Sequence, residues 1–145
     1  MKFLEISEPI YLEDLIKVED ELNIKFSSDF KEHYIEYNGG YPERDLYPWN
    51  DTETTTINTF FSIKYKGFGN VESTYKDLVI LEQYLPEKIM PFADDDGGNF
   101  FCVSFRDADY NHVYYCNNDH YNVIDNEEYL TFLKGSFGEF LNCLI

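Results

Sequence analysis

The stretch from residue 89 to residue 118 constrains the fold more than any other part of the chain. Three runs of apolar, aromatic and β-branched residues occupy positions 89–93, 100–105 and 113–116. Aspartate, asparagine and glycine dominate the two segments between these runs. Such residues tolerate positive φ angles or bond to their own backbone, so strands that alternate with them predict antiparallel hairpins. We expect a three-stranded meander on which the other elements pack.

Helical patterns flank this stretch. The first has apolar residues at Tyr11, Leu15, Val18 and Leu22, the spacing of one helical face. A second helix starts near Ser28 or Asp29 and is expected to stop at the Asn38-Gly39-Gly40 sequence, because glycine readily adopts the left-handed conformation that ends a helix. Further helices are expected at 71–85, at 127–134 after an Asp125 cap, and from Ser136 onward.

The remaining segment lies between these helices and the meander. Residues 55–63 alternate with a period of two, which predicts a half-buried strand, and residues 41–56 read as a loop. The chain of 145 residues is expected to form a single domain over 1–145. The predicted fold class is α+β, with an N-terminal helical hairpin, an antiparallel meander sheet and helices that flank the sheet.

Charge restricts the partners. Eleven basic residues against 28 acidic ones give a net charge of −17, which argues against binding nucleic acid directly and against an anionic membrane surface. No apolar run approaches the ~20 residues of a membrane span. Two interpretations remain open: the acidic residues serve solubility, or they steer association with a basic partner.

The cysteines indicate a compartment. There are three, Cys102, Cys116 and Cys143, and the first residues turn acidic without the apolar core of a secretory signal. An odd number of cysteines and no signal predict reduced, buried thiols in a cytoplasmic protein.

Two patterns resemble metal sites, but neither meets the requirements of one. Cys102, His112, Cys116 and His120 suggest zinc, but His112 and Cys116 would lie about 13 Å apart along a strand, too far to share one ion. Residues 94–99 resemble the start of a calcium loop, yet the twelfth position is Phe105 rather than glutamate. The chain also lacks a nucleophile elbow and a phosphate-binding loop. We therefore expect no catalytic site, no metal and no cofactor.

Several motifs, taken together, resemble a known family. In the first half they are the sequences at 19–24 (EDELNI), 26–31 (FSSDFK) and 37–40 (YNGG). In the second half they are those at 85–86, 90–93, 96–99, 101–103, 113–115 and 119–120. In order and spacing they resemble the SUKH superfamily, which is named partly for the yeast Smi/Knr cell-wall regulators. Ser27 replaces a usual proline, Cys116 replaces a common aromatic residue, and residues 41–68 match poorly.

The resemblance implies an α+β domain without catalytic activity. Bacterial members of the superfamily are largely immunity proteins that bind and neutralise a cognate toxin, often a nuclease, whereas fungal members are regulatory scaffolds. Because nuclease domains engage phosphate and are usually basic, the charge of −17 suits the first role. We expect an immunity protein with a basic toxin partner; the alternative is a cytoplasmic scaffold of the Smi/Knr type without a toxin.

Candidate contact residues lie at three places. They are Asp94, Asp95 and Asp96 in the first turn of the meander, Asn118, Asp119 and His120 after its third strand, and Tyr41, Tyr47 and Trp49 in the poorly matching segment. The aromatic residues are of the types that anchor interfaces. A lone tryptophan is also common in a core, and Asp119 and His120 also fit a local turn.

Overall fold

The structure is a computed structural model that describes residues 1–118 and 129–145. The helices are α1 (Leu12–Leu22), α2 (Ser28–Glu36), α3 (Val71–Tyr75) with its continuation η1 (Lys76–Leu81), and α4 (Phe137–Cys143). The strands are β1 (Phe3–Leu4), β2 (Tyr41–Pro42), β3 (Leu46–Pro48), β4 (Thr54–Phe60), β5 (Ile89–Asp95), β6 (Phe100–Ser104), β7 (Val113–Cys116) and β8 (Leu130–Lys134). Within this described part, no helix is both long and apolar enough to cross a membrane.

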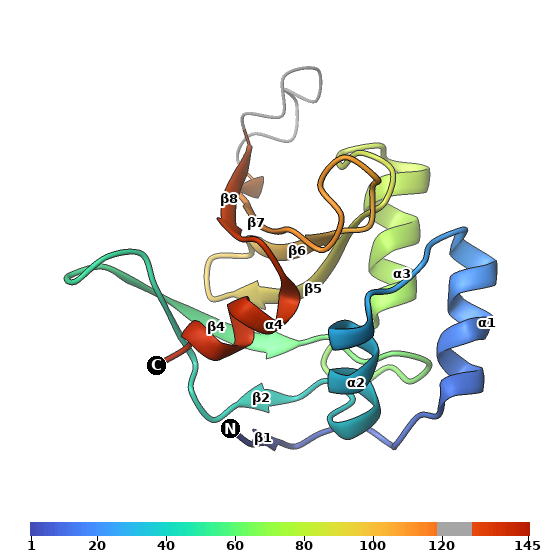
Figure 1. Cartoon of the computed structure of the whole chain (residues 1–145), viewed down its shortest axis with the longest axis horizontal. Coiled ribbons are helices and arrows are strands. Elements are labelled where there is room, and N and C mark those ends of the chain that lie inside the picture. The colour runs from blue at the N-terminus through green and yellow to red at the C-terminus, as the bar shows by residue number, and fades with distance from the viewer. Residues whose placement is uncertain (119–128) are drawn as a thin grey trace.

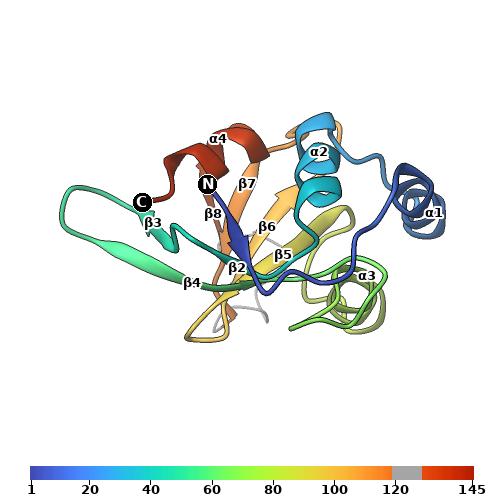
Figure 2. The same ribbon diagram turned by 90° about the horizontal axis from the view of Figure 1, so that it is seen from below.

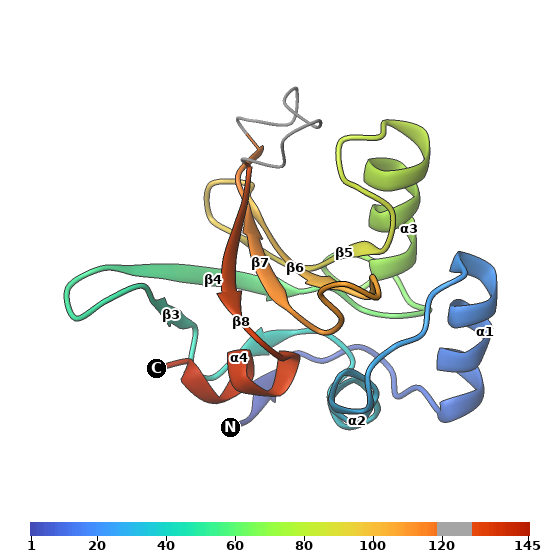
Figure 3. The same cartoon turned by 45° about the horizontal axis from the view of Figure 1, so that its top comes forward.

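A six-stranded antiparallel sheet forms the centre of the molecule, with strand order β3-β4-β5-β6-β7-β8 (Figure 1). Strands β5, β6 and β7 confirm the predicted meander, and β1 pairs with β2 in a separate two-stranded sheet. The β5–β6 register shifts between Pro91 and Ala93. Proline lacks a backbone N–H, so a central strand accommodates it best at such a bulge. The sheet is strongly curled (Figure 3).

Helices cover both sides of the sheet, which confirms the α+β class. In the view of Figure 2, α2 and α4 lie on one side of the sheet and α3 on the other. The α4 side is filled by aromatic rings: Phe92 of β5 lies 5.1 Å from Phe137 and 5.4 Å from Phe140, centroid to centroid. Each aromatic residue buries a large apolar area, so this cluster is a main source of stability.

The two N-terminal helices form where the apolar spacing predicts them. The buried face of α1 contains Leu15, Val18 and Leu22. Helix α2 starts at Ser28. The Gly39-Gly40 pair that follows α2 has positive φ angles of 78° and 94°. A Cβ atom on Gly40 would lie 2.4 Å from the carbonyl oxygen of Leu4, so only glycine fits this close approach.

The predicted helix at 127–134 is wrong. Residues Leu130–Lys134 form strand β8, which pairs with β7 from Cys116↔Leu130 to Val113↔Lys134. The free edge of β7 offers backbone partners that a local helical pattern cannot reveal, and pairing with it overrides the local preference. The following helix is confirmed as α4, and the Ser136 hydroxyl caps it by accepting from Glu139 N at 3.1 Å.

Two other segments also differ from their predictions. The helix expected at 71–85 begins at Val71 but changes to a π-helix at Lys76 and ends at Leu81. Its wider turn is visible in the bond from Glu82 N to Asp77 O, at 2.9 Å. The segment 41–56, predicted as a loop, contains β2 and β3. Strand β2 pairs with β1, which is distant in the sequence, and β3 pairs with β4 across a hairpin.

Candidate partner-binding surface

Three chain segments lie on one side of the molecule: the β5–β6 turn, the end of β7, and the β3–β4 hairpin, whose tip projects away from the other two (Figures 1 and 3). We call their shared exposed area the sheet-end surface. Its exposed or partly exposed residues are Trp49, Asp51, Glu53, Asp96, Tyr115 and Asn118, and Asp95 is buried under the β5–β6 turn. These segments lie on the opposite side of the molecule from α1 and α3 (Figures 1 and 3). The candidates Trp49, Asp95, Asp96 and Asn118 are thus brought to one place.

Asp95 organises the β5–β6 turn. Its Oδ1 atom accepts hydrogen bonds from the backbone N–H groups of Gly97 and Asn99, each at 2.9 Å, and its side chain is largely buried. Tyr115 of β7 donates its hydroxyl to Asp95 Oδ2 at 2.5 Å. Burial raises the pKa of Tyr115, and the adjacent Asp95 carboxylate raises it further. The turn is therefore fixed to β7 by a charge-assisted hydrogen bond.

Trp49 lies beside this turn. Its ring stands perpendicular to that of Tyr115, with centroids 5.4 Å apart, and its indole N–H donates to Thr55 Oγ1 at 2.6 Å. The residue is partly buried and packs against the edge of the core. Trp49 therefore packs against the core edge and stays partly accessible, and its role as an interface anchor stays a prediction.

Asn118 continues the surface from the end of β7. Its backbone N–H donates to Asn99 Oδ1 at 3.0 Å, and its side-chain amide donates to the carbonyl of Gly98 at 2.8 Å. These bonds hold the β5–β6 turn against the end of β7. The polar part of the surface is consequently pre-formed, which lowers the entropy cost of binding.

The charge of this end of the sheet is uncompensated. The segments 45–63, 89–105 and 113–118 contain no lysine or arginine. Their acidic residues are Asp45, Asp51, Glu53, Asp94, Asp95 and Asp96. In the described residues the ion pairs join Glu19 to Lys31, Asp14 to Lys64, Glu21 to Lys76 and Asp109 to Arg106. All of them lie outside these three segments, so the sheet-end surface keeps its negative potential.

Comparison with protein families shows which family the chain belongs to. The model of the SMI1 / KNR4 family (SUKH-1) matches residues 9–143, nearly the whole sequence. The chain belongs to the SUKH-1 family. A search of curated proteins finds no match. Family membership confirms the resemblance noted in the sequence and agrees with the α+β architecture, and members of the family are generally non-catalytic.

Two candidates take other positions in this SUKH-1 domain. Tyr47 is only 4% exposed, and its ring stacks on Phe140 of α4 with centroids 5.7 Å apart. It serves core packing, which corrects its placement among exposed anchors, because the β3–β4 hairpin turns it inward. Tyr41 lies on β2, where its ring contacts Phe68 at 4.8 Å, away from the sheet-end surface.

Another acidic candidate, Asp94, bonds to a neighbouring strand. Asp94 accepts from Thr59 N at 3.1 Å and from Thr59 Oγ1 at 3.0 Å, so it ties β5 to β4. Burial raises the pKa of Asp94, although the bonds from Thr59 oppose that rise. Asp119 and His120 lie outside the described residues.

Tyr115, Asp51 and Glu53 also belong to this surface but are not among the residues predicted from the sequence. One usable signal was the absence of basic residues from 45 to 63, which marks the hairpin as an uncompensated acidic segment. The contact between Tyr115 and Trp49 had no such signal, because it joins strands that are distant in the sequence.

The cysteines of the meander lie on neighbouring strands. Cys102 is opposite Tyr114 and Cys116 is opposite Phe100, so the two cysteines are diagonal neighbours, and both are fully buried. Burial raises the pKa of the Cys102 thiol, and Cys116 adds to the rise, so it is a poor nucleophile. Across residues 1–118 and 129–145, no three His, Cys, Asp or Glu side chains are grouped to hold a metal ion.

Proposed function

We propose that this SUKH-1 domain is a non-catalytic immunity protein that acts in the cytoplasm by binding and neutralising a basic toxin domain of the nuclease type. The observation that carries the proposal is the sheet-end surface, where Trp49 is partly exposed and the exposed carboxylates of Asp51, Glu53 and Asp96 make no ion pair in the described residues. A surface of this kind complements a protein whose own site is built to hold phosphate.

The physical basis of neutralisation is competition for the same positive surface. A nuclease collects lysine and arginine around the path of the nucleic acid backbone. The carboxylates of Asp51, Glu53 and Asp96 would take the place of phosphates there, and long-range attraction would speed the encounter. Trp49 supplies the apolar anchor that slows dissociation once the two surfaces meet.

The test begins with co-purification of the tagged chain from its own cell at low and moderate salt. We expect one basic polypeptide that is released as salt rises, because screening weakens attraction between exposed charges. The recovered polypeptide is then assayed on nucleic acid with and without the chain. Recovery of several unrelated housekeeping proteins instead would contradict the immunity role and favour the scaffold.

A pair of triple variants locates the surface. The test variant carries Asp51→Asn, Glu53→Gln and Asp96→Asn; the control carries Glu8→Gln, Glu32→Gln and Glu36→Gln. All six positions are exposed, and both variants change the net charge by the same amount. The test variant should lower the association rate with the recovered toxin about tenfold more than the control does. Equal effects would show that only total charge matters and would refute the assigned surface.

A further inference from the structure

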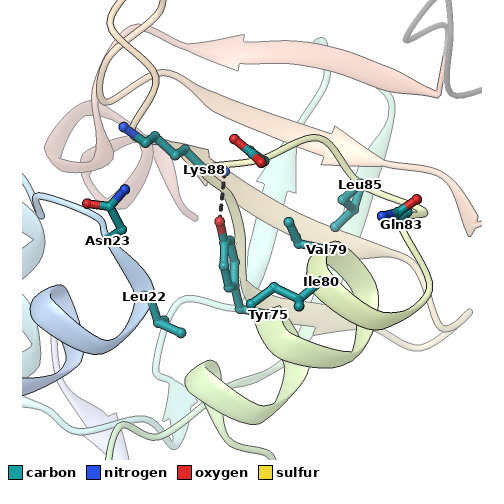
Figure 4. A pocket seen from close by; sticks show the side chains of 9 residues that line it. Leu22, Asn23, Tyr75, Val79, Ile80, Gln83, Leu85 and Lys88 are labelled. Carbon is teal, nitrogen blue, oxygen red and sulfur yellow. Dashed lines mark hydrogen bonds between the residues drawn. The ribbon is translucent and has the colours of Figure 1, made fainter.

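The end of α1 and the helix α3–η1 lie on the opposite side of the molecule from the sheet-end surface (Figure 1). A groove lies between them (Figure 4). It has a volume of about 460 Å³. The groove is lined by Leu22, Asn23, Tyr75, Val79, Ile80, Gln83, Leu85, Glu87 and Lys88. Its floor is apolar, its ends are polar, and none of its residues belongs to the sheet-end surface.

The π-helix shapes the mouth of this groove. Ile80 of η1 lines the groove and is 53% exposed, and the next residue, Leu81, is 73% exposed but does not line it. Turns of this type occur frequently at functional sites. Exposed aliphatic side chains at the rim of an apolar groove are unfavourable in water and favour an apolar occupant.

The walls are held by strained backbone. Among the described residues, six other than glycine have positive φ angles, and three of these line the groove: Asn23 at 55°, Gln83 at 56° and Lys88 at 67°. The backbone N–H of Lys88 donates to the Tyr75 hydroxyl at 2.8 Å, which fixes the loop after η1 to the helix (Figure 4). Strain of this kind persists where the surroundings hold it, and it concentrates at binding sites.

Charge defines the chemistry of the occupant. In segments 20–23 and 75–88, which contain all the residues that line the groove, the exposed carboxylates with no ion pair in the described residues are Asp20, Asp77, Glu82 and Glu87. Lys88 is the only cation among the described residues that line the groove, and it extends toward Asn23 at one end (Figure 4). Neither α1 nor η1 has a basic residue in its last turn. Helix C-termini carry partial negative charge, so the rim favours a cation.

We propose that this groove is a second docking site, for an amphipathic segment of a partner protein that places apolar side chains on the floor and lysine or arginine at the rim. This inference is independent of the proposed immunity function. A domain with docking sites on opposite sides can bridge two proteins, as a scaffold requires.

The first test titrates the full ¹⁵N-labelled chain with two synthetic peptides of equal length. One has leucine and lysine at amphipathic helical spacing; the other has glutamate in place of every lysine. The leucine–lysine peptide should shift the backbone amides of Asn23, Gln83 and Lys88 in a saturable manner, and the leucine–glutamate peptide should not. Equal responses to both peptides, or shifts confined to the sheet-end surface, would overturn the proposal.

A matched pair of variants gives the second test. Ile80→Gln and Leu12→Gln each replace an aliphatic residue on a helix, with 53% and 51% exposure, so both should fold. Leu12 lies at the far end of α1 from the groove. Ile80→Gln should weaken binding of the leucine–lysine peptide about tenfold, and Leu12→Gln less than about twofold. Equal losses in the two variants would contradict a specific groove.

Two further measurements distinguish a peptide in the groove from a second copy of the chain there and from a peptide at the sheet end. Sedimentation of the parent chain should show a monomer whose mass does not depend on concentration; a dimer abolished by Ile80→Gln would identify a second copy as the occupant and overturn the proposal. The sheet-end triple variant should retain the amide shifts at the groove. Their loss in that variant would place the peptide at the sheet end and would also overturn it.

Discussion

His33 makes folding of this domain sensitive to mild acid. Its side chain is enclosed by aromatic rings, among them Phe3 at 4.7 Å and Phe137 at 5.4 Å between centroids. The Nε2 atom is buried without a hydrogen-bond partner in the described residues. Burial lowers the pKa of His33 from 6.5 to about 4, because the charged imidazolium loses its hydration there.

The sign and size of the effect follow from linkage. The unfolded chain binds a proton at His33 below pH 6.5, while the folded chain does not until about pH 4. Stability is therefore complete above pH 6.5 and falls as the pH decreases toward 4. One pKa unit corresponds to about 1.4 kcal/mol, so His33 alone removes about 2 kcal/mol at pH 5 and about 3 kcal/mol at pH 4.

The assay is urea unfolding of the parent chain and of His33→Phe at pH 8, 6.5 and 5. The variant keeps an aromatic ring and removes the titrating group, so it should lose about 2 kcal/mol less than the parent between pH 8 and pH 5. Any packing cost of the larger ring is the same at each pH and cancels in this comparison. An identical loss in both proteins, or a His33 ring resonance that titrates near pH 6.5 in the folded state, would refute the reasoning.

Two further predictions concern side chains and backbone that hold the fold. Burial opposes the charge of Asp109, but bonds donated by the side chains of Arg106, Ser104 and Tyr114 outweigh it and hold the pKa of Asp109 below its usual range. Asp109→Asn should cost about 3 kcal/mol in urea unfolding at pH 7, and that difference should shrink as the pH falls below 3.8. Gly40→Ala should cost about 2 kcal/mol or more by the same assay, since its Cβ would meet Leu4.

The sequence was sufficient where structure is decided by neighbours in the chain. The apolar spacing of α1 and the turn chemistry between β5, β6 and β7 are local, and both elements form as predicted. Strand β8 is decided by the free edge of β7, which lies outside any local window. The same reason explains Tyr47: its burial depends on α4, about ninety residues later in the chain.

The candidate surface, too, was predictable only where neighbours in the chain decide the structure. The turn at 94–99 was recognisable as an acidic tip, and Asn118 was recognisable as its neighbour after the third strand. The inward direction of Asp95, which bonds to Tyr115, depends on the registers of both β4–β5 and β6–β7. A bulge in either ladder reverses which side chains face outward, and sequence spacing alone does not place such bulges.

The acidic residues of this domain divide into two kinds by their surroundings. Asp29 and Asp109 are held by several donors each and serve the fold, and Glu19 accepts from the Phe26 backbone at 2.8 Å while it pairs with Lys31. At the sheet end, by contrast, exposed Asp51, Glu53 and Asp96 make no ion pair in the described residues. Acids of the first kind stabilise the chain, whereas the second kind only adds repulsion to it. A basic partner would relieve this repulsion, so the acidic sheet end is consistent with the proposed function.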